Sequence, residues 1–272
     1  MPPEIRNILD EWSPPLVLST LLLLSGIVYI RGWHKISRTR PALFPVWRLI
    51  CFLLGLAITW LAVGSPLDGF ADALLSAHMM EHVLLMSFVP PLLLLGNPQV
   101  PLLRGLPRVL RTSLLNPMIR SRLLRTIGHT LVQPIVAWLL MNLTFLAWHV
   151  PAAYDFALEN EHWHQFEHLC FLATSILFWW PVIRPWPTAV RYSGWILLPY
   201  LVGADIVNTA LSAFLAFCDL PVYSYYIEHP NPFHISPMAD QISGAVLMWV
   251  IGSLVFLVPA VVITVHLVSG KR

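Results

Sequence analysis

The stretch from His78 to Gly96, HMMEHVLLMSFVPPLLLLG, opens with the motif H-x-x-E-H and continues as an almost unbroken apolar run. The same pattern returns in residues 164–182, HQFEHLCFLATSILFWWPV. Each run is close to the roughly 20 mostly apolar residues that a transmembrane helix needs. The two stretches therefore predict two membrane helices, each of which begins with a pair of histidines and a glutamate.

The composition of the whole chain agrees with an integral membrane protein. Its 272 residues are 57% hydrophobic and 11% charged, whereas soluble domains carry roughly a quarter charged residues. The cysteines lie in apolar runs without C-x-x-C spacing, which argues against a disulfide framework or a thiolate metal cage. The first residues have no basic segment before a short apolar core, so we expect insertion through the first transmembrane helix and not through a signal peptide.

Seven apolar segments are predicted to cross the membrane. They are Pro14–Ile30, Trp47–Gly64, Leu74–Leu95, Leu131–Trp148, His164–Ile183, Trp195–Phe217 and Ile242–Leu267. Pro90 and Pro91 lie inside the third segment and are expected to kink it. Most tryptophans, Trp179 among them, are expected in the interfacial belt. The predicted fold class is all-α: a polytopic membrane protein in which residues 1–272 form one seven-helix domain.

The distribution of charge predicts the orientation. Basic residues gather in alternate connections and at the C-terminus: Arg31, Lys35, Arg38, Arg40, Arg48, Arg104, Arg108, Arg111, Arg120, Arg122, Arg125, Arg184, Arg191, Lys271 and Arg272. If seven spans alternate, all of these lie on one side, and only Arg6 lies on the other. The positive-inside rule then places the N-terminus outside and the C-terminus in the cytoplasm. Topology and anionic lipid account for the arginines, so nucleic acid is not an expected partner.

Histidines and acidic residues gather on the predicted outer side. Residues four apart on a helix share a face, so His78 and His82 point in one direction, with Met86 one turn deeper. His164 and His168 form the matching pair in the fifth span. Because the spans alternate in direction, both pairs are expected at the same depth, near the outer membrane surface.

Two further side chains are expected at compatible depths. His149 ends the fourth span, and Met248 lies two turns into the seventh. Imidazole nitrogen suits copper, zinc and iron, and thioether sulfur favours Cu(I). The predicted metal ligands are His78, His82, His149, His164, His168, Met86 and Met248.

Acidic residues are predicted around these ligands. Neighbours at i+1 on a helix do not share a face, so Glu81 and Glu167 are each expected to serve a histidine of the opposite helix. Asp205 lies inside the sixth span, where an ionisable group is costly. Asn208 and Ser212 continue its face, which predicts a polar seam within the bundle, whether a proton path, an ion path or a structural network.

Three ordered segments resemble the multi-pass CtaG family of cytochrome c oxidase assembly factors. They are HMMEHVLLMSFVPPLLLLGNP, WHVPAAYDFAL with EHLCFLATSILFWWPV, and SPMADQISGAVLMW. The resemblance covers about residues 13–268. It implies a multi-pass protein of the bacterial plasma membrane, a chaperone in respiratory-chain biogenesis that helps copper reach a haem-copper oxidase subunit. The positions that it carries over are His78, His82, His149, Asp155, His168, Asp240 and Gln241.

The first hypothesis is therefore a copper-handling assembly factor and not an enzyme, with a ligand set that is incomplete or open to solvent so that metal can leave. A zinc-dependent membrane hydrolase is the runner-up, because H-x-x-E-H is also the inverted zinc-peptidase motif. In the family, glutamine can stand at the position of Glu81, which weakens a catalytic role for that residue. A haem b electron carrier with histidine ligands from two helices and a scaffold without metal are the remaining alternatives.

Overall fold

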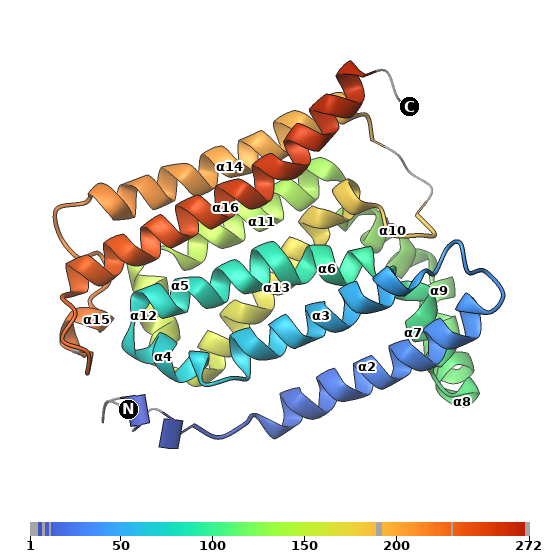
Figure 1. Cartoon of the computed structure of the whole chain (residues 1–272), viewed down its shortest axis with the longest axis horizontal. Helices are drawn as coiled ribbons and strands as arrows, with labels where there is room; N and C mark the ends of the chain where they lie inside the picture. Colours follow the sequence, from blue (N-terminus) through green and yellow to red (C-terminus); the bar gives the residue numbers. More distant parts are fainter. Residues whose placement is uncertain (1–4, 7–8, 11, 189–191, 230, 270–272) are drawn as a thin grey trace.

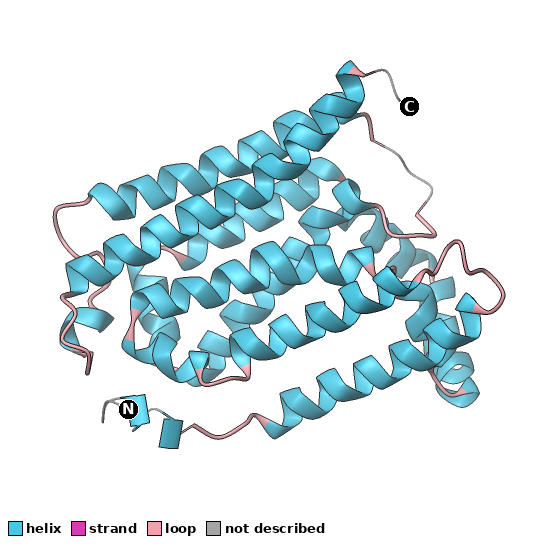
Figure 2. Cartoon of the chain, viewed as in Figure 1, coloured by secondary structure: helices cyan, strands magenta, loops and turns pink. Residues whose placement is uncertain are grey.

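The computed structural model describes residues 5–6, 9–10, 12–188, 192–229 and 231–269. Arg191, Lys271 and Arg272, which contributed to the predicted orientation, lie outside these ranges. Within them the chain forms helices joined by loops (Figures 1 and 2). The body of the bundle is built from α2 (Leu16–Ser37), α3 (Val46–Val63), the continuous segment α5 (Leu75–Val83), η1 (Leu84–Phe88) and α6 (Val89–Leu95), and α11 (Pro134–Trp148), α13 (Glu161–Ile183), α14 (Gly194–Phe217) and α16 (Pro237–Val268); α10 (Arg122–Leu131) precedes α11.

Six helical segments are long and apolar enough to cross a membrane. They are Leu16–Ser37, Val46–Ala73, Leu75–Leu95, Glu161–Ile183, Gly194–Phe217 and Pro237–Val268. The seventh predicted span is reached only if α10 and α11, bent by 69°, count together. Helix α11 has 15 residues, about 22 Å at 1.5 Å per residue, and so falls short of the roughly 30 Å hydrocarbon core. It starts anew at Pro134, where the missing amide is tolerated.

Short helices close the two ends of the bundle (Figure 1). We call one end the histidine end; it carries α4 (Leu67–Ala73), α12 (Pro151–Leu158) and α15 (Tyr225–Glu228). The arginine end carries α7 (Gln99–Gly105), α8 (Arg108–Leu110), η2 (Arg111–Leu115), α9 (Asn116–Arg120) and α10. The segment α5–η1–α6 contacts α3, α13 and α16. Its central place determines where its histidines lie.

A π-helical turn lies directly before the proline pair at which the sequence predicted a kink. Pro90 has no amide hydrogen to donate to the carbonyl of Met86, four residues before it. The indole Nε1 of Trp179 donates to that carbonyl at 3.2 Å, and the π-helical turn Leu84–Phe88 immediately precedes the prolines. Trp179 is 4% exposed within the described bundle. Its prediction as an interfacial residue was therefore wrong, because it satisfies a carbonyl in the core.

Candidate metal site

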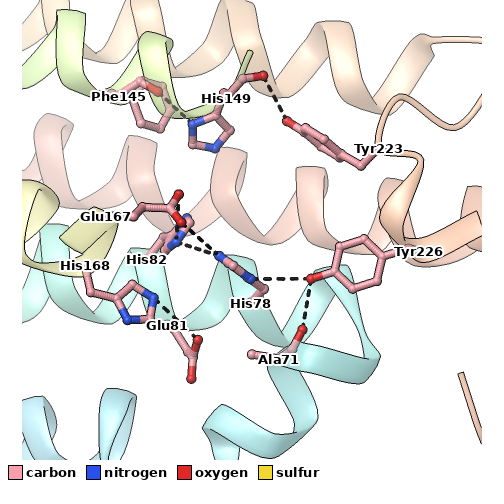
Figure 3. Close-up of polar contacts among 10 residues, drawn as sticks. All are labelled: Ala71, His78, Glu81, His82, Phe145, His149, Glu167, His168, Tyr223 and Tyr226. Carbon is pink, nitrogen blue, oxygen red and sulfur yellow. Dashed lines mark hydrogen bonds and ion pairs between the residues drawn. The ribbon is translucent and has the colours of Figure 1, made fainter. Parts of the chain in front are cut away.

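The two H-x-x-E-H motifs face each other at the histidine end (Figure 3). Helix α5 contributes His78 and His82, and helix α13 contributes His164 and His168. All four side chains are buried, with exposed fractions of 0%, 1%, 8% and 8% in that order. The i,i+4 spacing places each pair on the inner face of its helix, so the two pairs meet within the bundle.

The glutamates cross between the helices. Glu81 on α5 lies 3.7 Å from the Nε2 atom of His168 on α13. Glu167 on α13 lies 3.6 Å from the Nε2 atom of His82 and 4.0 Å from that of His78. The sequence predicted that each glutamate would serve a histidine of the opposite helix; each carboxylate lies beside such a histidine, but none of these distances is a hydrogen bond. Both carboxylates are 0% exposed.

The hydrogen bonds of Tyr226 determine which nitrogen of His78 carries the hydrogen. The Tyr226 hydroxyl donates to the carbonyl of Ala71 at 2.9 Å and lies 3.4 Å from Nδ1 of His78. Since its hydrogen is already used, the hydroxyl accepts from Nδ1–H of His78. Burial raises the pKa of Tyr226 well above its usual value and keeps this hydroxyl neutral. The Nε2 atom of His78 is left with a lone pair, 2.8 Å from Nε2 of His82.

His149 is held in the same way by a backbone carbonyl. Its Nδ1 atom lies 2.7 Å from the carbonyl oxygen of Phe145, and because a carbonyl only accepts, this nitrogen donates. The Nε2 lone pair is then free for a ligand, the arrangement that metal-binding histidines usually show. The ring of His149 lies 6.0 Å from that of His82, so the structure brings the predicted fifth histidine to the edge of the cluster.

The unpaired nitrogen and oxygen atoms of the cluster are suitable ligands for a metal cation. Within the described residues, buried atoms without a hydrogen-bond partner include both carboxylate oxygens of Glu81 and Glu167, Nδ1 of His82, and Nε2 of His149, His164 and His168. Leaving buried acceptors unpaired is costly, and a cation would satisfy several of them at once. Two groups of three residues each bring their ligand atoms within 4.8 Å of one another. One group is His78, His82 and His168, and the other is His78, Glu81 and His164. His78 belongs to both.

The predicted methionines lie one layer below the histidines. Met86 and Met248 line a cavity of about 30 Å³ that reaches up to His82. Asn208, from the predicted polar seam, lines the same cavity, and its side-chain amide donates to the carbonyl of Met248 at 3.3 Å. Asp205 is half-buried and is not among the residues that line this cavity. Of these two residues of the predicted seam, Asn208 therefore reaches the cavity below the histidines and Asp205 does not line it.

Asp240 and Gln241 hold the surrounding helices in place. Asp240 accepts from the backbone amides of Leu75 at 2.6 Å and Ser76 at 3.1 Å, and so caps the start of α5. Gln241 accepts from the amide of Val222 at 2.7 Å and donates to a carbonyl of α14 at 3.0 Å. Neither contacts a histidine through these bonds, so their contribution to the site is positional.

A layer of tyrosines covers the histidines. Tyr154 on α12, Tyr223 and Tyr226 are 0%, 1% and 5% exposed, and the rings of Tyr154 and Tyr223 stack at 4.0 Å. The expected ligand set was incomplete or open to solvent; these rings shield the histidines, so the structure does not show the open form. Sequence reasoning also missed the tyrosines themselves; the signal for Tyr223 and Tyr226 is the run VYSYYIE in residues 222–228, whereas Tyr154 lies in PAAYDFAL, residues 151–158.

Asp155 joins two parts of this cover. Its carboxylate accepts from the backbone amides of Ser224 at 3.3 Å and Tyr225 at 3.2 Å, and from the Ser224 hydroxyl. We expect Asp155→Ala to loosen α15 by about 1–3 kcal/mol, the cost of unpairing these donors. Hydrogen exchange should rise in residues 222–229 and stay unchanged in α13. Glu159→Ala, at an exposed position one turn later, is the control, and equal exchange in both variants would contradict the assignment.

Comparison with known proteins agrees with these features. Residues 27–269 match the family described as cytochrome c oxidase caa3 assembly factor, Caa3_CtaG. Uncharacterized proteins of Mycobacterium bovis and Mycobacterium tuberculosis are each 29% identical over 283 residues, which cover 98% of this chain and 40% of theirs. An uncharacterized protein of Mycobacterium leprae is 26% identical over 268 residues, 91% of this chain and 38% of its own. This chain thus spans less than half the length of these curated relatives.

No solved structure matches this chain significantly. The family assignment therefore rests on the sequence, and it covers both H-x-x-E-H motifs, the end of α11 and the start of α16. Those segments also supply the buried cluster. Because the match extends over most of its length, the chain belongs to the Caa3_CtaG family of cytochrome c oxidase caa3 assembly factors.

Proposed function

We propose that this protein handles copper during the assembly of a caa3-type cytochrome c oxidase, with the buried histidine cluster as its copper site. One observation carries the proposal: histidines from α5, α13 and the residue that ends α11, His149, converge with two glutamates in a buried cluster, where several ligand atoms have no protein partner among the described residues. Membership of an oxidase assembly family supplies the process. The partner in this proposal is an oxidase subunit, met within the membrane.

The proposed orientation places the histidine end outside the cell. The arginine end carries Arg104, Arg108, Arg111, Arg120, Arg122 and Arg125 on its short helices, and the positive-inside rule assigns such segments to the cytoplasm. We take the protein to be a single domain of the bacterial plasma membrane with seven spans, in which the short α11 is the fourth and α10 leads into it at a bend of 69°. Copper would then be received and passed on at the outer side.

The cluster suits a copper ion as cargo. Neutral imidazoles supply the nitrogen ligands, and the carboxylates of Glu81 and Glu167 balance the charge of the ion inside a low-dielectric bundle. Met86 and Met248, at the cavity below, supply the soft sulfur atoms that favour Cu(I). Tyr226 and the Phe145 carbonyl keep the ring hydrogens of His78 and His149 directed away from the ligand atoms.

The burial of the glutamates disfavours the hydrolase alternative. A general base must reach its water or substrate within hydrogen-bond distance. Glu81 and Glu167 are both 0% exposed beneath a tyrosine cover. In addition, each glutamate faces a histidine, which is the position of a group that orients or neutralises a ligand. The family also implies a role without catalysis.

Copper binding tests the proposal directly. The detergent-purified protein, loaded with Cu(I) and then desalted, is expected to retain about one copper ion per chain, and His78→Ala/His82→Ala is expected to retain none. The matched control is His162→Ala/His229→Ala, which removes two exposed histidines at the same end. Metal content by mass spectrometry and the optical spectrum are the readouts. Equal copper in all three proteins, or a Soret band in the parent, would contradict the proposal.

A further inference from the structure

Besides the cavity below His82, a groove lies at the arginine end, away from the histidines. Its volume is about 560 Å³, and it lies between α10, the residue that follows it, Val132, and the last turns of α13. Arg125, His129 and Arg184 line it together with the hydroxyl-bearing side chains of Thr188 and Tyr192. The rest of its wall is mainly apolar, from Leu131, Val132, Ile176, Leu177, Trp180 and Pro181. The groove thus combines basic side chains with an apolar wall.

Helix α10 has the character of a helix that lies in a membrane surface. Its N-terminus is capped by Ser121, whose hydroxyl accepts from the amide of Leu124 at 3.4 Å. Its apolar side chains Leu123, Leu124 and Ile127 are 69%, 44% and 45% exposed, and arginines alternate with them. The bend of 69° to α11 turns it away from the direction of the spans. An amphipathic helix of this kind lies with its apolar face among acyl chains and its basic groups at the headgroups.

Within the described residues, the positive charges of Arg125 and Arg184 are not neutralised by an ion pair. Arg184 ends α13 in a left-handed conformation, with a φ angle of 54°, and its backbone amide donates to the carbonyl of Trp180 at 2.8 Å. Within the described part of the chain, neither Arg184 nor Arg125 forms an ion pair, and no carboxylate lines the groove. The groove is therefore an uncompensated positive site beside apolar side chains.

We propose that this groove binds an anionic phospholipid. Arg125 and Arg184 hold the headgroup phosphate, and the hydroxyls of Thr188 and Tyr192 are placed to donate hydrogen bonds to it. The acyl chains lie along Ile176, Leu177 and Trp180. A free phosphate ion would use only the basic half of this lining, whereas a zwitterionic lipid would bring a cation to a site that already carries two. The basic side chains and the apolar wall together select an amphiphile with net negative charge.

This lipid site is independent of copper handling. None of its lining residues belongs to the histidine cluster or to the cavity below it. The bound lipid would hold α10 against the end of α13. It would thereby fix the position of α10 at the membrane surface, next to the short α11. Loss of the site is therefore expected to leave copper binding intact.

Lipid retention in the purified protein is the test. After delipidation and incubation with phosphatidylglycerol, native mass spectrometry should detect bound lipid, whereas phosphatidylcholine or inorganic phosphate at equal concentration should give none. We expect Arg125→Gln/Arg184→Gln to lower retention about tenfold or more. Arg120→Gln/Arg122→Gln removes the same charge from the same amphipathic region without touching the groove lining, and it should retain lipid as the parent does.

Several outcomes would overturn the proposal. They are equal retention of phosphatidylcholine, binding of inorganic phosphate alone, and equal losses in both double variants. Arg125→Gln alone alters an exposed side chain on a surface helix, so it should fold even if the double variant does not. A several-fold loss is expected from it, and parent-like retention would contradict the assignment. Copper content, measured in the same samples, should stay at the parent level.

Discussion

Replacing His78 by alanine is expected to abolish copper retention, with a loss of affinity of roughly 100-fold or more. His78 is the one residue that belongs to both candidate ligand sets, so its loss breaks both. His164→Ala breaks only the set that includes Glu81, and the set of His78, His82 and His168 remains. We therefore expect a smaller effect from His164→Ala. The order of the two variants tests the geometry beyond the mere presence of histidines.

Competition with a Cu(I) chelator gives the affinities for this comparison. Cells that carry the chain in place of their own assembly factor provide the second readout, the activity of the caa3 oxidase relative to the amount of its subunits. His162→Ala, at an exposed position two residues before His164, is the control and should resemble the parent in both assays. If His78→Ala and His164→Ala were equally mild, the shared position of His78 would have no functional meaning.

Asp240→Ala is expected to lower the free energy of unfolding by about 3 kcal/mol, the largest loss that we expect from one polar side chain. The carboxylate is 2% exposed and accepts from the first amides of α5, a helix whose own N-cap residue, Leu74, offers no side-chain bond. Without it, two amides at a buried helix start lose their partner. His78 lies one turn further along, so copper affinity should fall as well.

Thermal unfolding in detergent measures the stability, and two variants provide the comparison. Asp240→Asn keeps one oxygen acceptor and should fall between the parent and Asp240→Ala. Ser236 is the N-cap of α16, the helix that contains Asp240, and its hydroxyl accepts from the amide of Ala239 at 3.2 Å. Ser236→Ala should therefore cost about 1 kcal/mol. If Ser236→Ala were as damaging as Asp240→Ala, the effect would belong to α16 and not to the start of α5.

The lengths of the apolar segments predicted the spans, and the helical spacing predicted which glutamate lies beside which histidine. The predicted boundaries of the second, third, fifth and sixth spans agree with the helices to within a few residues. The crossing of Glu81 to His168 and of Glu167 to His82 followed from the direction of i+1 neighbours on a helix. Both properties are local, since they depend only on which residues share a face or a hydrophobic stretch.

The contacts that shield and position the histidines were not predictable in this way. Asp240 caps a helix that begins 165 residues earlier in the chain, and no local pattern encodes such a partner. Tyr226 lies on a four-residue helix, too short to show a period. Trp179 resembles any interfacial tryptophan until the freed carbonyl beside Pro90 gives it a buried acceptor. These features arise from packing between distant segments, and so they appear only in three dimensions.

The small cavity below His82 has a consequence for ion selectivity. A buried water molecule needs at least about 10–15 Å³, so a cavity of about 30 Å³ has room for about two or three. Mg²⁺ usually keeps several waters and gives them up reluctantly, and it would not enter in hydrated form. Cu(I) accepts sulfur ligands in place of water, which Met86 and Met248 provide. Between these helices, discrimination among metal ions becomes a matter of which ion sheds its hydration shell.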